Sequence, residues 1–184
     1  FSDFRWDNAG QAAGLTLNGQ LTTVNGNLTI NNTNLYSLSL ATAANSTYTL
    51  QVGNKLQVNA NSWLVINGGD NITATVNVGG DFEMTGPLSN STYFDFYYYS
   101  GSSATLNKVI LNVTGDFLLS GGFFDLAYGD SDAAAYNERR LSGDLSVSGN
   151  GILTTGTGDN SISNGRLLFT KAGSQSFTAT NPAN

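Results

Sequence analysis

The chain contains no cysteine and no histidine among its 184 residues. The absence of cysteine excludes disulfide bridges and thiolate metal sites, and it leaves the redox environment of the protein open. The absence of histidine removes the commonest general base and the commonest metal ligand, together with every serine–histidine or cysteine–histidine nucleophile pair. Composition alone therefore argues against catalysis of these kinds, and we expect no catalytic residue and no cofactor.

Charge is also scarce. Charged residues make up 11% of the chain, against roughly a quarter of an average soluble domain. Seven Lys and Arg residues against thirteen Asp and Glu residues give a net charge of −6, which is too little positive charge for a phosphate-tracking stripe or a polybasic membrane patch. No apolar run approaches the roughly 20 residues that span a bilayer. We therefore expect no nucleic-acid partner and no membrane insertion, and a surface of Asn, Ser, Thr and Gly suits an exported protein.

What the chain does have is an internal repeat. A motif that reads apolar-x-Gly-x-Leu/Phe-x-apolar recurs with starts 26 to 35 residues apart, with the Gly one place early in the second copy. Its five copies are Val24–Ile30, Val52–Val58, Val78–Met84, Val113–Leu119 and Leu141–Val147. In each copy an apolar residue ends one strand, a Gly-Asp or Gly-Asn corner turns the chain, and an alternating apolar pattern begins the next strand.

Two further strand patterns separate successive copies of the motif. One is rich in aromatic and aliphatic residues, as in 63–66 and 93–96, and the other leads back into the next corner, as in 72–78 and 108–113. Three short strands and three corners predict one turn of a coil of about 27 residues. Stacked coils place like residues above one another. The predicted inward columns are Leu28, Leu56, Phe82, Phe117 and Leu145; Ile30, Val58, Met84, Leu119 and Val147; and Val24, Val52, Val78, Val113 and Leu141.

These columns predict an all-β fold, a β-solenoid (β-helix) of about five to six coils with three short strands in each. The alternative is a β-sandwich or jelly roll, whose short strands and turns are also regular. We expect a single domain over 1–184, with a first partial coil at 1–23, an irregular aromatic insertion at 87–108 and a last partial coil at 166–184. The nearest approach to a helix is Ser131–Arg140, which we interpret as a helical turn within a loop.

Several strings resemble the repeats of large secreted surface proteins of Bacteroidota, and they cover nearly the whole chain: Phe4–Gly10, Gly14–Gly19, Val24–Ile30 and Leu168–Thr178. The resemblance implies a right-handed β-helix at the cell surface or in the extracellular matrix, without catalytic residues. The stretch 87–103 departs from the pattern because it is longer and more aromatic. In such arrays a segment like Gly173–Phe177 is followed by one like Phe1–Trp6, whereas here the first closes the chain and the second opens it.

A solenoid without polar caps has open strand edges at both ends, and head-to-tail contact between identical subunits generates a filament. We therefore expect a non-catalytic structural subunit of an extracellular fibre or cell-surface layer, a homopolymer joined through its chain ends. The alternatives are a piece of one long surface protein, a surface adhesin or glycan-binding stalk module, and a polysaccharide-active β-helix enzyme.

Two sets of residues are candidates for contacts outside the core. In the adhesin interpretation Tyr97, Tyr98 and Tyr99 supply a subunit or sugar contact, and the alternative is a local bulge whose rings pack on the side of the solenoid. Among six N-x-Ser/Thr sequons, Asn45 and Asn90 lie in the most loop-like contexts and are the candidate sites of glycan attachment in a glycoprotein.

Charged residues offer little further chemistry. A β-helix enzyme needs carboxylates or a cation clustered on one face, and we interpret the single dense charged group as a solvated loop. The recurrence of Asp81, Asp116 and Asp144 at one repeat position indicates a corner device. Segments 128–132 and 156–160 carry oxygen ligands suited to calcium but match no known calcium loop, so we expect no metal. The members of the dense charged group are Asp125, Asp130, Asp132, Glu138, Arg139 and Arg140.

Overall fold

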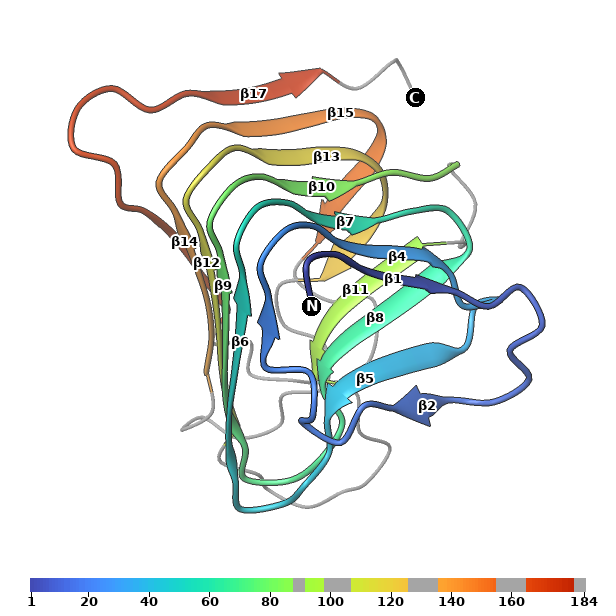
Figure 1. Cartoon of the computed structure of the whole chain (residues 1–184). Helices are drawn as coiled ribbons and strands as arrows, with labels where there is room; N and C mark the ends of the chain where they lie inside the picture. Colours follow the sequence, from blue (N-terminus) through green and yellow to red (C-terminus); the bar gives the residue numbers. More distant parts are fainter. Residues whose placement is uncertain (88–91, 98–106, 126–135, 155–164, 181–184) are drawn as a thin grey trace.

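The computed structural model describes residues 1–87, 92–97, 107–125, 136–154 and 165–180. Its strands stack into a β-solenoid of about five turns (Figure 1). Every pair of neighbouring strands is parallel, which confirms the solenoid and excludes the antiparallel β-sandwich. The coil is right-handed, as connections between parallel strands almost always are. The described residues contain no helix, and so none that is long and apolar enough to cross a membrane.

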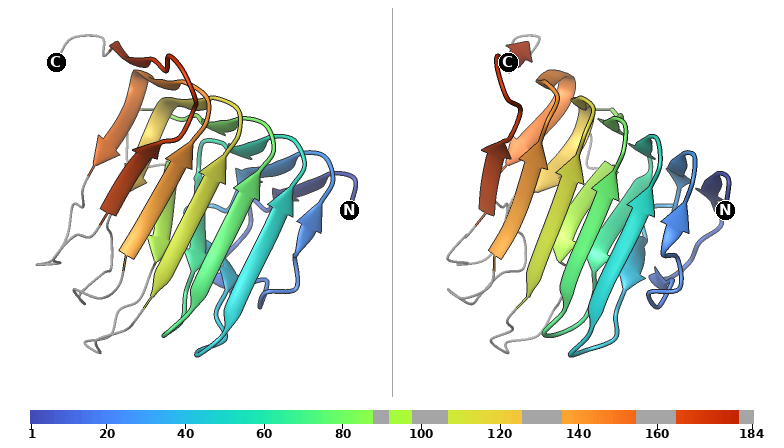
Figure 2. Two further views of the ribbon diagram at one scale, coloured as in Figure 1. Left: turned by 90° about the vertical axis from the view of Figure 1, so that its left-hand side faces the viewer. Right: turned by 60° about the vertical axis from the view of Figure 1, so that its left-hand side comes forward.

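The strands line three faces of the coil, as the turned views show (Figure 2). The first face holds β1 (Phe4–Asp7), β4 (Leu28–Asn32), β7 (Leu56–Val58), β10 (Phe82–Met84), the first parts of β13 (Phe117–Asp125) and β15 (Leu145–Thr154), and β17 (Phe177–Thr180). The second face holds β2 (Leu15–Thr16), β5 (Ser37–Ala41), β8 (Ser62–Asn67), β11 (Thr92–Tyr97) and the second parts of β13 and β15. The third face holds β3 (Thr23–Val24), β6 (Thr47–Val52), β9 (Thr73–Val78), β12 (Lys108–Val113), β14 (Tyr136–Leu141) and β16 (Gly165–Phe169).

All three predicted inward columns are confirmed in register. On the first face Leu28 pairs with Leu56, and Phe82 lies between Leu56 and Phe117. On the third face the column of valines continues from turn to turn in the same way. The cause is the period-2 alternation of a strand, visible in β6, where exposed and buried residues alternate without exception. The core is therefore a set of apolar ladders that run along the solenoid axis.

One difference concerns the number of separate strands in the later turns. The first and second strands of a turn were expected to be separate, but β13 and β15 each run continuously around the corner between two faces. Their pairing shifts register between Leu119 and Gly121, which marks an irregularity at the corner. Gly122 there has a φ of +79°, and an added Cβ would meet the carbonyl oxygen of Thr92 at 2.8 Å. Glycine thus lets the backbone bend without ending the strand.

The recurring aspartates are corner devices, as predicted. The backbone N–H of Asp116 donates to Oδ1 of Asp81 at 2.9 Å, and that of Asp144 donates to Oδ1 of Asp116 at 2.9 Å. Ser176 continues the ladder by donating to Oδ1 of Asp144 at 3.0 Å. This backbone bond is the main reason that the pKa of Asp144 lies below its ordinary value. Each carboxylate thereby fastens its own corner to the next one.

The interpretation of the charged group as a solvated loop is wrong for Glu138 and Arg139. Both belong to β14, so the described part of the helical turn expected at Ser131–Arg140 is a strand, and they are 5% and 0% exposed. Arg139 pairs with Leu111 and Leu167, so strand alternation turns it into the core. Its Nη1 donates to the carbonyl of Asn137 at 3.1 Å.

The structure describes only some of the other residues of the charged group. The guanidinium of Arg139 lies 5.8 Å from the ring centre of Phe124, and Arg140 forms an ion pair with Glu138. Asp125 ends β13, and 126–135, with Asp130 and Asp132, lies outside the described residues.

Candidate assembly faces and an amide-lined groove

The solenoid is open at its N-terminal end, which we call the N-terminal face and which consists of β1, β2 and β3. Each of these strands pairs with one neighbour among the described strands, so its other edge presents backbone donors and acceptors. At β3 the N-terminal amine of Phe1 donates to the carbonyl of Thr23 on this edge at 3.4 Å. The inward columns stop there without a cover, and Leu15 is 42% exposed as a result. An apolar hollow of about 200 Å³ lies at this end. Its lining residues are Phe1, Phe4, Leu17, Gln20 and Leu21.

The opposite end, the C-terminal face, is formed by β16, β17 and the second part of β15. Phe169 is 47% exposed and Phe177 is 59% exposed, although both occupy inward columns. All four residues of β17 are exposed. An apolar hollow of about 330 Å³ opens beside this strand. Its lining residues are Val147, Gly151, Ile152, Leu153, Phe177 and Ala179.

The two faces belong to the same ladders. The second-face column that begins at Leu15 passes through Leu38, Leu64, Phe94 and Phe124 and ends at Leu153. In the same way, the third-face column that begins at Val24 ends at Phe169. Because the strands all run in one direction, each face fits the opposite face of a second copy rather than itself. Such a contact is heterologous and does not close into a dimer.

The edge strand β1 carries two charges, which commonly discourage edge pairing. Arg5 and Asp7 neutralise each other here through an ion pair of 2.6 Å between exposed side chains. The hydrogen bond from Arg5 is the main reason that the pKa of Asp7 lies below its ordinary value. The edge therefore carries no net charge that would repel an incoming strand.

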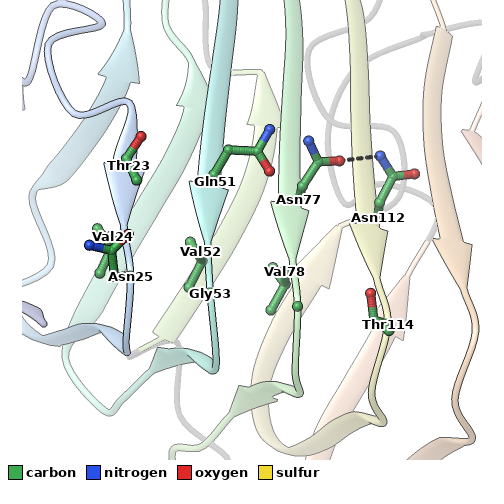
Figure 3. Close-up of a pocket in the computed structure, with 11 residues that line it drawn as sticks. Thr23, Val24, Asn25, Gln51, Val52, Gly53, Asn77, Val78, Asn112 and Thr114 are labelled. Carbon is green, nitrogen blue, oxygen red and sulfur yellow. Dashed lines mark hydrogen bonds between the residues drawn. The ribbon is translucent and has the colours of Figure 1, made fainter. Parts of the chain in front are cut away.

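A groove crosses the third face at right angles to its strands (Figure 3). Its volume is about 370 Å³, within the usual range for ligand sites. One uncharged polar side chain from each of four successive strands lines it, in register across β3, β6, β9 and β12. These side chains are Thr23, Gln51, Asn77 and Asn112.

The local chain explains the polarity of the groove. Val52 and Val78 point into the core and are buried, and the residues that follow them, Gly53 and Gly79, let successive turns lie close together beneath the groove. An added Cβ at Gly53 would collide with the carbonyl of Asn25. The amide of Asn112 donates to Oδ1 of Asn77 at 2.6 Å, as the dashed line shows (Figure 3). That bond leaves the Asn77 nitrogen and the Asn112 oxygen to a ligand that both donates and accepts.

The sequence did not point to this groove. Its polar residues carry a weak signal, since Gln51, Asn77 and Asn112 each stand directly before the valine that precedes a corner. A polar residue at that outward position in three turns is compatible with ordinary solvent exposure. Only the register of the strands shows that the three amides lie side by side.

Most of the residues singled out by sequence lie outside the described part of the chain. Tyr97 ends β11, where its backbone pairs with that of Asn67, and its side chain lies outside the described part, as do Tyr98, Tyr99 and Asn90. Asn45 is exposed at a corner with a φ of 56°. Its Oδ1 accepts from Asn71 at 3.1 Å, so the amide nitrogen to which a glycan attaches is not used by that bond.

No group of three or more acidic side chains that could hold a metal occurs among the described residues. Both segments considered for calcium lie wholly outside them. No protein-family profile matches the chain, and no curated protein or solved structure matches it. The fold and the geometry of its faces therefore carry the functional argument.

Proposed function

We propose that this protein is a non-catalytic structural subunit of an extracellular fibre or cell-surface layer, assembled head to tail through its two open faces. The observation that carries the proposal is that apolar ladders run the length of the solenoid and end uncovered at both faces. The resemblance of the sequence to repeats of large secreted Bacteroidota surface proteins agrees with this role. So do the scarcity of charge and the exposed sequon at Asn45.

The mechanism of such a subunit is mechanical. Contact between opposite faces would join the sheets of two copies, so that backbone hydrogen bonds and apolar ladders continue along the axis. Each large apolar side chain that becomes fully buried contributes about 1.5–3 kcal/mol, which works against the entropic cost of association. Exposed side chains such as Leu15 and Phe169 supply this term at the two ends.

A charge on one face tests the proposal. Leu15→Asp places a carboxylate at the end of an inward column on the N-terminal face, and sedimentation velocity over a concentration series reads out assembly. The matched control is Leu35→Asp, because Leu35 is 41% exposed but lies at a corner of a later turn. We expect the parent and the control to assemble and Leu15→Asp to remain monomeric. Equal assembly by all three proteins, or by none, would contradict the proposal.

The groove on the third face favours a second candidate, a glycan-binding module. Its uncharged amides match the hydroxyl groups of a neutral polysaccharide, and its course along the axis suits an extended ligand. Titration calorimetry with cellohexaose and laminarihexaose tests this candidate. Gln51→Ala and Asn77→Ala should weaken binding at least tenfold, whereas Thr75→Ala, on the same sheet but outside the groove, should not. Absence of heat with both sugars at millimolar concentration would count against it.

A further inference from the structure

At the C-terminal face, the three sides of the solenoid do not all end at the same turn. Among the described strands, β17 lies beyond β15 on the first face, but the second face ends with β15 and the third face ends with β16. At the N-terminal face, in contrast, β1, β2 and β3 together complete a turn, one strand to each face. A second copy stacked upon β17 would therefore meet the first face only. The other two faces would each lack a strand, and Leu153 and Phe169 would stay uncovered.

Each of the three faces continues across the junction without a missing strand if β1 of the second copy takes the position of β17. Then β1 lies on the first part of β15, β2 lies on the second part of β15, and β3 lies on β16. By the registers in the structure, this arrangement stacks Phe4 on Leu145, Leu15 on Leu153 and Val24 on Phe169. Phe1, whose carbonyl accepts the N–H of Asn25 at 2.8 Å beside Val24, makes way for Phe169 in this contact. All three joined columns remain apolar.

We propose that β17 is a placeholder strand, displaced from β15 by β1 of a second copy of this chain during assembly. This inference rests on the proposed head-to-tail function and specifies its contact. The binding surface is the outer edge of β15, and the partner is an identical chain that offers Phe4–Asp7. Assembly is then strand exchange rather than simple stacking of finished ends.

In this proposal β17 binds the outer edge of β15 less tightly than β1 of a second copy does. All four residues of β17 are exposed, and the strand pairs with β15 alone among the described strands. Where β1 has Trp6, β17 has Ala179, because Trp6 pairs with Ile30 and Ala179 with Val147 in the same column. The apolar hollow of about 330 Å³ beside Ala179 is left by this small side chain. The indole of an incoming Trp6 would occupy it.

The hydrogen bonds between successive corners are also compatible with strand exchange. Asp144 Oδ1 now accepts the backbone N–H of Ser176 at 3.0 Å. The corresponding residue before β1 is Asp3, whose Oδ1 accepts the N–H of Asn27 at 2.6 Å in its own chain. In the exchanged junction the N–H of Asp3 would take the place of the Ser176 N–H on Asp144. The exchange thus keeps the backbone bond to Asp144, and it gives up the bonds that Nε2 of Gln175 donates to the carbonyls of Leu141, at 2.9 Å, and of Gly143.

A reversible lock tests the placeholder directly, because the parent chain has no cysteine. Ser146 and Thr178 are in-register partners on β15 and β17 and point away from the core. Neighbouring strands lie about 4.8 Å apart, which suits a disulfide. The variant Ser146→Cys/Thr178→Cys, oxidised at high dilution, therefore fixes β17 in place. Thr29→Cys/Gln57→Cys, an in-register pair on β4 and β7, is the matched control.

We expect the oxidised Ser146→Cys/Thr178→Cys protein to stay monomeric in sedimentation velocity and to assemble once reduced, while the control assembles in both states. Circular dichroism checks that each oxidised protein is folded. Ser176→Pro, which removes the N–H donated to Asp144, should lower the concentration needed for assembly at least threefold. Filaments formed equally well by the locked protein would overturn strand exchange but leave the proposed function standing. Failure of the parent itself to assemble would overturn both.

Discussion

At the residue scale, the corners of the solenoid depend on glycines that allow one turn to lie close upon another. An added Cβ at Gly115 would meet the carbonyl carbon of Gly80 at 2.7 Å, and one at Gly143 would meet that of Gly115 at 2.4 Å. The Asp ladder on the following residue fastens the same corner. The Gly-Asp pair thus has two separate roles, close approach and hydrogen bonding, which explains why both residues recur together.

Gly53→Ala should therefore destabilise the fold. The methyl group would collide with the carbonyl of Asn25 in the preceding turn, and such overpacking costs about 1–3 kcal/mol. Urea unfolding followed by circular dichroism measures the loss. Gly10→Ala is the matched control, because its Cβ would meet nothing closer than an Asn8 side-chain oxygen at 3.8 Å. Equal stability of Gly53→Ala and the parent would show that the turns are not in close contact here.

A buried tyrosine predicts the response to alkaline pH. The hydroxyl of Tyr48 donates to the carbonyl of Leu21 at 2.7 Å, and burial raises the pKa of Tyr48 well above its ordinary value of 10.0. As the pH rises, Tyr48 ionises in the unfolded chain before it ionises in the folded protein. The contribution of neutral Tyr48 to the free energy of unfolding is therefore complete below pH 10 and is lost as the pH rises further. Tyr48→Phe should be less stable by about 0.5–1.5 kcal/mol at pH 7.

The same variant should lose less stability than the parent between pH 9.5 and 11.5. The measurement is the melting temperature of Tyr48→Phe and of the parent across this pH range. Parallel curves for the two proteins would mean that Tyr48 does not remain neutral in the folded state.

At the element scale, aromatic rings join the first and second faces in the middle of the solenoid. Phe82 of β10 stacks on Phe117 of β13 with ring centres 4.6 Å apart and meets Phe94 of β11 edge-on at 5.1 Å. Phe124 completes the cluster at 5.4 Å from Phe82. Two strands of one turn and their neighbours in the next are thereby held by one group of side chains.

Phe82→Ala should remove about 3–5 kcal/mol of stability, since it deletes a ring that is 0% exposed. Chemical denaturation is again the measurement. Tyr36→Ala is a useful comparison because Tyr36 is 42% exposed, and substitutions at such positions usually change stability by less than about 0.5 kcal/mol. A loss for Phe82→Ala no larger than that for Tyr36→Ala would contradict the central position of the cluster.

Hydrogen exchange should separate interior strands from end strands. Backbone amides of β9 lie between β6 and β12, whereas β17 pairs with β15 alone in the described part. We expect amides of β9 to exchange at least about 100-fold more slowly than those of β17. Similar rates in the two strands would contradict the marginal hold of β17 on which strand exchange depends.

Much of this element structure could be predicted from the sequence. The inward columns could be read because Leu, Ile and Val recur at fixed offsets from each Gly-Asp corner, and register follows once the corners are aligned. β14 was missed because three charged residues, Glu138, Arg139 and Arg140, conceal the alternation. Its position before the corner at Leu141 matches that of β6, β9 and β12, so the repeat itself held the better signal.

At the scale of the whole molecule, the solenoid is a segment of a continuous ladder with two different open ends. The N-terminal face completes its turn, whereas the C-terminal face is topped by a single exposed strand. The groove and the end hollows could not be predicted from the sequence, because they depend on which strands lie side by side and not on any local motif. The end hollows arise where the ladders stop, and the groove arises where outward side chains of successive strands line up.

The central claim, head-to-tail assembly, is tested most directly by negative-stain electron microscopy of the purified chain over a concentration series. The account predicts filaments above a threshold concentration. If each copy adds the six strands of its third face, the axial repeat is about 29 Å at about 4.8 Å per strand. Separate, uniform particles at every concentration would contradict the account.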